Sequence, residues 1–305
     1  MESKKHVEGF LSKMKDRNYS YATVETYRRP VIFFLAHMRK SRIGRIQDVT
    51  EGDIMKYRGH LVERKLSANT VDLYLRSVKL FFRHLEREGI VFINPAEGLQ
   101  MPKPGRKLQP VPSVGEMEKL ISSIDTSTAI GIRDRAMIET AYSTGMRLGE
   151  LRSLDTGSVD MAQGLVRVLG KGSKERVVPI GKQAVSWIAE YLKKRPSQGA
   201  EGDERGAAAF CLHRPPLWVT SSGKGLSRVA LQKMLDSRWR KADVHTRISF
   251  HAIRRACATH MLRNGAHPVE LQLLLGHSEM RTLSHYLRTT ITDIKKMHDN
   301  TRLGK

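Results

Sequence analysis

The sequence predicts a mainly α-helical protein of two domains, the second of which contains a small β-hairpin or sheet. Three observations support this fold class. Apolar residues recur at helical spacing along most of the chain, a short β-branched stretch surrounds a glycine-rich turn, and a proline-rich segment separates two parts. A chain of 305 residues is also longer than one ordinary domain. We place the first domain at residues 1–105, a linker at 106–113 and the second domain at 114–305.

The chain is strongly basic. It has 53 Lys and Arg against 31 Asp and Glu, a formal net charge of +22. The excess of cations is present in both halves, so both domains are expected to face the same polyanion, and nucleic acid is the commonest polyanion in a cell. Charge alone leaves a ribosomal protein or a basic membrane-surface protein as alternatives.

Several classes of protein are excluded by pattern. The sequence contains no run of 18 apolar residues, so we expect no segment that spans a membrane. The N-terminus also lacks the apolar stretch of a secretory signal. Two cysteines, Cys211 and Cys257, cannot build a disulfide scaffold, and neither has a partner at zinc-finger spacing. We therefore expect a soluble protein of the cytoplasm, associated with the nucleoid, with no bound metal and no cofactor.

The first half is predicted to be entirely helical. Apolar spacing begins near Val7, a helix capped by Ser20 follows, Thr50 begins a capping box, and Ser67 or Asn69 opens a fourth helix. One side of this last helix is cationic, with the residues Arg76, Lys79, Arg83 and Arg87. Such a row is either a solvated helix face or a surface that lies along a DNA backbone, and the sequence leaves both interpretations open.

The linker region has an unusual composition. Residues 101–113 include four prolines, three cations and no acid, which is typical of an extended segment. Its cations, Lys103, Arg106 and Lys107, are candidates for contact with DNA phosphates.

The second half mixes helices with one hairpin. Strands are expected at 165–169 and 175–180, because β-branched residues flank a tight turn at 170–174. Residues 196–215 are expected to form a surface loop. Helices are expected at roughly 114–124, 130–143, 181–194, 227–241, 250–264, 267–275, 280–287 and 290–298.

Two segments could bind an anion. A helix is expected to end at Gly145 and another to begin at once, which would place Arg147 at a helix N-terminus beside backbone N–H groups. The hairpin turn carries Lys171 and Lys174 but lacks the spacing of a phosphate-binding P-loop. A lysine at a hairpin tip is usually solvated, although it could also reach into a DNA groove and deliver a proton.

A third segment is the richest in chemistry-bearing side chains. His251 and Arg254 are three residues apart and would share one face of a helix. His277 follows a glycine that ends a helix, and Tyr286 comes nine residues later. Each of these residues taken singly also has an ordinary structural explanation.

Taken together, these residues resemble the tyrosine recombinases of the Xer and phage-integrase type. The resemblance covers nearly the whole chain, from the helical core-binding domain through the linker to the mixed catalytic domain. The order Arg, Lys, His-x-x-Arg, His and Tyr of that family matches Arg147, Lys171, His251, Arg254, His277 and Tyr286. Two departures are a long loop at 196–215 and Leu287–Arg288 after the tyrosine, where Xer proteins usually have Thr-His.

The resemblance implies a metal-free and ATP-independent reaction. Tyr286 would attack a phosphodiester and form a 3′-phosphotyrosyl bond, which keeps the energy of the broken linkage for rejoining. Arg147 and Arg254 would bind the non-bridging oxygens, since guanidinium stays charged at any pH. His251 would act as general base, His277 would place the phosphate, and Lys171 would protonate the leaving 5′-oxygen. Glu150 is expected to orient local side chains.

The resemblance also implies an assembly. Four subunits would hold two double-stranded DNA recombination sites, each subunit donating its C-terminal segment to a neighbour, with a second recombinase or an accessory protein as an open question. The biological task, chromosome-dimer resolution or mobile-element integration and excision, also stays open. The alternatives are a strand transferase acting as topoisomerase or telomere resolvase, and a catalytically silent DNA-binding accessory protein.

Overall fold

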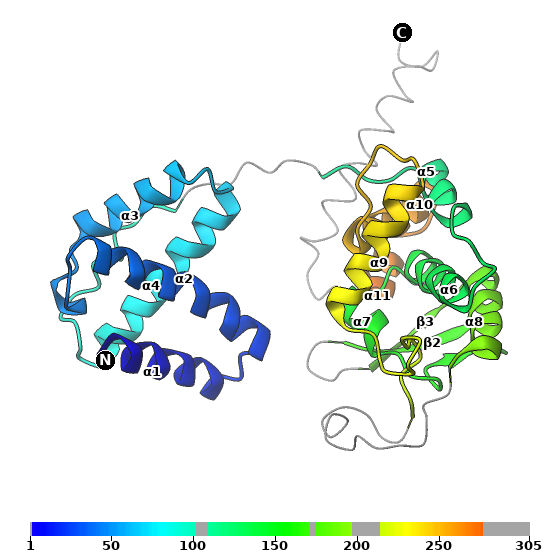
Figure 1. The fold of residues 1–305 in the computed structure, drawn as a ribbon, viewed down its shortest axis with the longest axis horizontal. Coiled ribbons are helices and arrows are strands. Elements are labelled where there is room, and N and C mark those ends of the chain that lie inside the picture. Colours follow the sequence, from blue (N-terminus) through cyan, green and yellow to red (C-terminus); the bar gives the residue numbers. More distant parts are fainter. Residues whose placement is uncertain (1, 102–108, 171–174, 197–213, 277–305) are drawn as a thin grey trace, which may run out of the picture. The chain divides into compact units, whose positions relative to one another are not determined.

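The computed structural model describes residues 2–101, 109–170, 175–196 and 214–276 (Figure 1). The chain divides into two compact units, Met1–Leu108 and Gln109–Lys305. The described part of the first unit is helical, and that of the second combines helices with one small antiparallel sheet. This confirms the predicted fold class.

The N-terminal unit contains the four helices that the apolar spacing predicts. They are α1 (Glu2–Asp16), α2 (Tyr21–Lys40), α3 (Glu51–Glu63) and α4 (Ala68–Arg87), with a short 3-10 helix η1 (Ile46–Asp48) before α3. The predicted caps are confirmed. Ser20 accepts from the N–H of Thr23, Thr50 and Asp53 form a capping box, and Ser67 rather than Asn69 caps α4.

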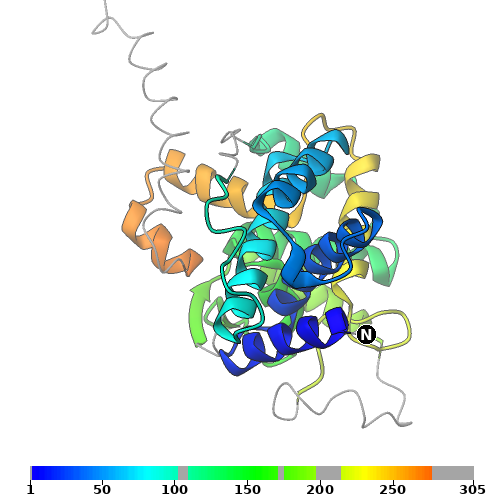
Figure 2. The same cartoon turned by 90° about the vertical axis from the view of Figure 1, so that its left-hand side faces the viewer.

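Aromatic side chains fill the core of this unit. α2 packs against α4 (Figure 2), and the Phe34 ring lies edge-on to both Tyr57 and Phe82. Edge-to-face pairs of this kind stabilise a core beyond the area they bury. The apolar face of α4 is therefore used for folding, and its opposite side faces solvent.

The C-terminal unit has seven helices and three strands among its described residues. They are α5 (Val114–Ser122), α6 (Ala129–Thr144), α7 (Leu148–Ser153), β1 (Val159–Asp160), β2 (Leu165–Leu169), β3 (Glu175–Pro179), α8 (Lys182–Lys194), α9 (Arg228–Lys241), α10 (Phe250–Arg263) and α11 (Pro268–Leu275). The helices expected at 280–287 and 290–298, and most of the loop expected at 196–215, lie outside the described residues.

The sheet is the predicted hairpin with one added strand. β2 pairs antiparallel with β3, with Val166 opposite Val178 and Leu169 opposite Glu175, which confirms the predicted strand pair. β1 pairs with the other edge of β2. β1 was not predicted, because two residues are too few to show the alternation that identifies a strand.

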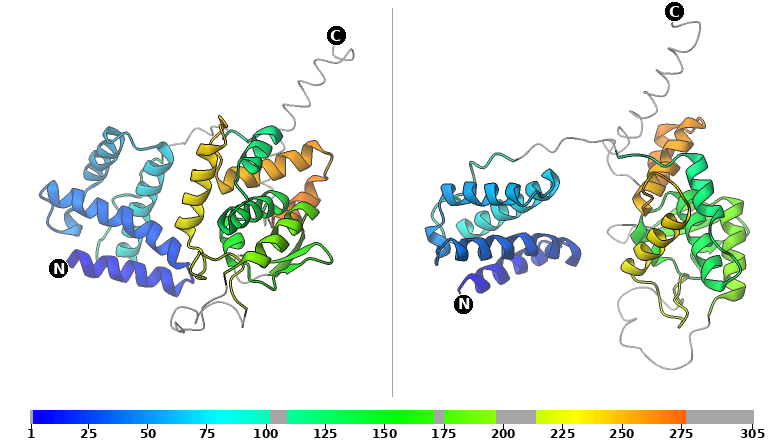
Figure 3. Two further views of the ribbon diagram at one scale, coloured as in Figure 1. Left: turned by 45° about the vertical axis from the view of Figure 1, so that its right-hand side comes forward. Right: turned by 45° about the horizontal axis from the view of Figure 1, so that its top comes forward.

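Helix α6 occupies the centre of the C-terminal unit. It contacts both α8 and α10 and is buried along most of its length, charged residues included (Figure 3). Among the latter, Asp134 pairs with both Arg133 and Arg238 at 2.7 Å, so its buried charge is compensated. Because α6 is packed on several sides, its C-terminal end is held in place, and the candidate site lies at that end.

Candidate active site

The end of α6 places Arg147. Gly145 terminates the helix in the left-handed conformation, with φ of 60°, and Arg147 is the N-cap of α7, as the sequence predicts. The turn is tight, because a Cβ added to Gly145 would lie 2.7 Å from Leu275 Cδ2 and 3.1 Å from Cys257 Sγ. A glycine is therefore required here both for its backbone angle and for its lack of a side chain.

We expect Gly145→Ala to destabilise the protein by about 1–2 kcal/mol or more, because the left-handed conformation alone costs that much for an L-residue and the added methyl group also meets Leu275. Thermal or urea unfolding measures this. Gly149→Ala is the matched control, because that glycine is helical and the Cβ it would gain has no atom within 4 Å apart from the adjacent residues and the backbone of its own helix. Equal stability of the two variants would contradict the tight turn.

Glu150 connects two arginines of the site, Arg147 and Arg176. Its buried carboxylate accepts four hydrogen bonds: from the backbone N–H of Arg147 at 2.7 Å, from Arg147 Nη1 at 2.9 Å, and from Arg176 Nη1 and Nη2 at 2.9 and 3.0 Å. Burial would raise the pKa of this carboxyl, but the hydrogen bonds from Arg176 and from the Arg147 backbone outweigh it and lower the pKa. Glu150 thus holds a charge that orients its neighbours, as the sequence analysis expects.

Arg254 lies on α10 and is buried, with 4% of its surface exposed. Its Nη1 donates to the carbonyl of Gly145 at 2.6 Å and its Nη2 to the carbonyl of Leu275 at 2.7 Å. These carbonyls belong to the ends of α6 and α11, so the two bonds fix the plane of the guanidinium between two helices.

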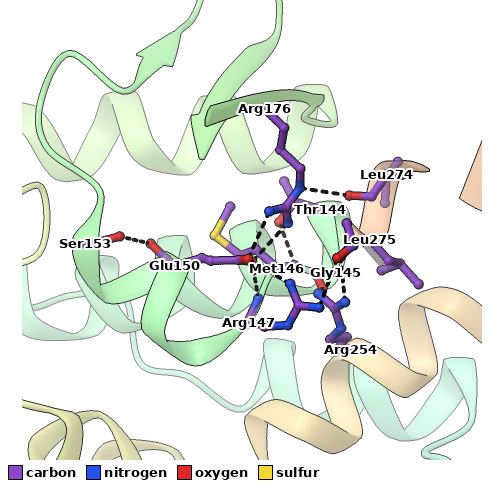
Figure 4. Close-up of polar contacts among 11 residues, drawn as sticks. Thr144, Gly145, Met146, Arg147, Glu150, Ser153, Arg176, Arg254, Leu274 and Leu275 are labelled. Carbon is purple, nitrogen blue, oxygen red and sulfur yellow. Dashed lines mark hydrogen bonds and ion pairs between the residues drawn. The ribbon is translucent and has the colours of Figure 1, made fainter. Parts of the chain in front are cut away.

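The two arginines converge on the end of α11 (Figure 4). Arg147 Nη2 donates to the carbonyl of Gly276 at 3.1 Å, one residue after the carbonyl that Arg254 binds. The side chain of Arg147 is 41% exposed, whereas Arg254 is buried. The structure therefore brings two guanidinium groups together beside the residue that precedes His277, one of them accessible from solvent.

His251 stands in the first turn of α10 and is exposed at the surface. Although the residue as a whole is exposed, neighbouring atoms partly desolvate its ring, and this effect, followed by the positive charges of Arg254 and Arg255, lowers its pKa from the ordinary value. The neutral imidazole, which can accept a proton, is therefore the main form at neutral pH. A cavity of about 270 Å³ opens beside it. The polar residues that line this cavity are Arg228, Gln232, Asp236, Arg247, Ser249 and His251.

Other predicted site residues lie outside the described part of the chain. They are the catalytic candidates Lys171, His277 and Tyr286 and the DNA-binding candidates Lys103, Arg106, Lys107 and Lys174. The glycine expected before His277 is confirmed as a helix end, because Gly276 caps α11 with φ of 62°.

Three of the α4 cations form ion pairs with acidic residues, which were not predicted. Arg76 binds Asp72 at 3.0 Å, and Lys79 and Arg83 lie 3.5 and 3.6 Å from Glu97. The side chains of Arg76 and Arg83 are 62% and 42% exposed, and that of Lys79 is 22% exposed. Exposed ion pairs are weak. A phosphate could therefore replace these carboxylates as the partner of Arg76 or Arg83.

Arg176 also belongs to the site, although it was not predicted as a site residue. This residue lies on β3, and only its order after the hairpin turn is visible in the sequence. An arginine at a half-buried strand position was the available signal, because a buried cation usually has an anionic partner. In the described ranges, no group of three His, Cys, Asp or Glu side chains could hold a metal ion. None of the described helices is long and apolar enough to cross a membrane.

Two protein families match the chain. The phage integrase family matches residues 113–292, and the phage integrase N-terminal SAM-like domain matches residues 7–90. The tyrosine recombinase XerD of Listeria innocua is 31% identical over 284 residues, which are 93% of each chain. The XerD recombinase of Staphylococcus aureus is also 31% identical over 284 residues, with the same coverage.

Solved structures share the fold. The XerH site-specific recombinase in a post-cleavage complex with palindromic difH substrate has a TM-score of 0.75 at 20% identity, and the match covers 95% of this chain and 83% of that one. A λ integrase tetramer bound to a Holliday junction has a TM-score of 0.69 at 16% identity, covering 92% and 76%. The chain belongs to the phage integrase family and is a Xer-like, tyrosine-type site-specific recombinase, an enzyme that cleaves and rejoins DNA. The predicted family is thereby confirmed.

Proposed function

We propose that Arg147 and Arg254 hold the scissile phosphate of a recombination site while Tyr286 attacks it. The single observation that carries this proposal is the convergence of both guanidinium groups on the end of α11, next to His277 in the chain. A phosphodiester gains negative charge in the transition state, and guanidinium groups fixed in advance stabilise that charge without reorganising. The attack joins Tyr286 Oη to the 3′-phosphate and releases the 5′-oxygen.

His251 is the proposed general base. Its lowered pKa keeps the imidazole neutral and able to accept the Tyr286 proton, which is tightly held at the reference pKa of about 10. Lys171 protonates the leaving 5′-oxygen and His277 places the phosphate. Because the phosphotyrosyl bond conserves the energy of the broken linkage, the reverse attack by another 5′-hydroxyl rejoins DNA without ATP.

Both units are proposed to bind double-stranded DNA, as a clamp joined by the linker at 106–113. The assignment of residues 1–105 as the core-binding domain and 114–305 as the catalytic domain rests on the family matches and on the net charge of +22. The proposed phosphate contacts are Arg76, Lys79, Arg83, Lys103, Arg106, Lys107 and Lys174. Such contacts release counterions, so binding should weaken steeply with salt. Because its proposed substrate is DNA, the proposed location of the protein is the nucleoid, in the cytoplasm.

A homotetramer on two duplexes is the proposed working assembly, formed with or without a second recombinase or accessory protein. The λ integrase structure is described as a tetramer bound to a Holliday junction, which supports this arrangement. The apolar residues Ile291, Ile294 and Met297 recur at helical spacing in the C-terminal segment. A short helix is marginal alone and must dock, and docking on a neighbour closes a ring without a self-complementary patch.

We expect deletion of residues 290–305 to leave DNA binding by single subunits intact but to abolish recombination between two sites. The segment begins four residues after Tyr286, so its absence also uncouples the nucleophile from a neighbour. Sedimentation of the protein on paired sites and a two-site recombination assay measure the two effects. Strand exchange by the truncated chain at the full-length rate would refute the coupling role.

A substrate with a nick beside the cut phosphate tests the function as a whole. The short 5′-product diffuses away, so the covalent protein–DNA adduct accumulates. Adduct formation would exclude a catalytically silent binding protein, and exchange between two duplexes would exclude a topoisomerase that only relaxes DNA.

A further inference from the structure

We infer that Arg176 is a positioning residue that sets the orientation of Arg147 through the carboxylate of Glu150. This inference rests on the proposed role of Arg147 as a phosphate-binding group. Arg176 lies on β3, whereas Arg147 and Glu150 belong to the start of α7 (Figure 4). The three side chains meet only in the folded protein.

The Glu150 carboxylate is held in one orientation by Arg176. Arg176 binds it through both Nη atoms, at 2.9 and 3.0 Å, in the two-point arrangement that fixes the plane of both groups. The same two oxygens accept the backbone N–H and Nη1 of Arg147. A carboxylate held flat by Arg176 therefore presents its remaining lone pairs to Arg147 at one angle, and the Arg147 guanidinium is oriented by that angle.

Arg176 also contacts the end of α11. Its Nε donates to the carbonyl of Leu274 at 3.4 Å. A Cβ added to Gly276 would lie 3.0 Å from both Cζ and Nε of Arg176, so the guanidinium packs directly against this glycine. Arg147 donates to the carbonyl of the same Gly276. Arg147 and Arg254 together are called the phosphate clamp below. Arg176 thus bounds, from the sheet side, the place where these two arginines converge.

The Arg176–Glu150 pair is largely buried. The Arg176 side chain is 19% exposed and that of Glu150 is 6% exposed, so the pair is shielded from solvent. Removing one partner of a buried pair takes away part of the compensation of the other charge. In the absence of Arg176, Glu150 would have Arg147 as its remaining guanidinium partner and would draw it toward the interior. An Arg147 held in this way is less able to bind a phosphate.

The hairpin adds a further connection. Arg176 comes five residues after Lys171 on the strand that leaves the turn. The Arg176–Glu150 bond therefore ties the strand that follows the proposed general acid to the helix that bears the proposed phosphate-binding arginine.

The test compares Arg176→Ala with Arg167→Ala, an exposed arginine on the neighbouring strand β2 that controls for the loss of one positive charge on the hairpin. Affinity for the duplex site and the single-turnover rate on the nicked substrate are measured for each. We expect Arg176→Ala to cleave ~10–100-fold more slowly, by analogy with the loss caused by removing residues that orient the ligands of a catalytic metal, with unchanged affinity. Millimolar guanidinium chloride should restore part of the rate, and equal sodium chloride should not.

A double variant isolates the route of the effect. If Arg176 acts through Glu150, the double variant Glu150→Gln with Arg176→Ala should be no slower than the slower single variant, because the two substitutions remove one interaction. Multiplicative losses, a parental rate for Arg176→Ala, or a rate loss that only follows lost affinity would each overturn the inference. Arg176→Lys retains the charge and serves if the alanine variant does not fold; it should cleave at an intermediate rate.

The outcome also separates this inference from the proposal on which it rests. A parental cleavage rate for Arg147→Ala would refute the phosphate clamp itself. A parental rate for the Arg176 variants, with Arg147→Ala impaired, would leave the clamp in place and refute the positioning role.

Discussion

Tyr286→Phe is expected to abolish covalent cleavage of DNA while leaving the fold and the affinity for the site unchanged. The substitution removes one hydroxyl oxygen, which is the proposed nucleophile, and retains the aromatic ring. The nicked substrate provides the measurement, because the parent enzyme accumulates as a protein–DNA adduct that survives denaturation. Filter binding or gel shift of intact duplex reports the affinity in parallel.

The control for this experiment is another tyrosine. Tyr142 donates to or accepts from His260 Nδ1 at 2.7 Å, and burial raises its pKa to about 12, so it is a poor source of a phenolate. Tyr142→Phe is expected to retain cleavage. An adduct formed by Tyr286→Phe, or its loss in Tyr142→Phe with the fold intact, would refute the assignment of the nucleophile.

The second large effect concerns the phosphate clamp. Arg147→Ala and Arg254→Ala are each expected to lower the cleavage rate by ~10²–10³, the typical cost of removing one transition-state donor. The rate is measured in a single turnover with saturating protein, so that weaker DNA binding does not contribute. A change of less than tenfold in either variant would show that the guanidinium does not contact the reacting phosphate.

The two clamp variants should differ in stability. Arg147 is partly exposed, and Glu150 stays paired with Arg176 when the Arg147 side chain is removed. The free energy of unfolding of Arg147→Ala should therefore change little. Arg254 is buried, and its removal leaves the carbonyls of Gly145 and Leu275 without that partner, at about 1–3 kcal/mol for each unsatisfied group. Chemical denaturation of both variants checks this difference. Equal stability would show that the carbonyl contacts of Arg254 contribute nothing to the folded state.

Local sequence determined the secondary structure closely. The caps at Ser20, Thr50 and Ser67, the glycine ends of α6 and α11, and the β2–β3 hairpin were all predictable. These signals act between residues about four positions apart, which is the length of a helical turn or a tight turn. They can therefore be recognised in the sequence alone. The family was also evident from sequence, because six chemically specified positions in fixed order are a pattern that needs no tertiary information.

Only the tertiary structure decided which side chains meet. Arg254 binds the carbonyl of a residue 109 positions earlier, and Arg176 binds Glu150 across 26 positions. Two cations of α4, Lys79 and Arg83, likewise pair with Glu97, a residue that lies outside that helix. Such contacts depend on how α6, α10 and α11 pack around one core and on the register of the hairpin, and neither is encoded in any short window. The sequence therefore predicted the candidate reacting groups, and the packing of helix ends against the sheet determined the geometry in which two of them, Arg147 and Arg254, are held.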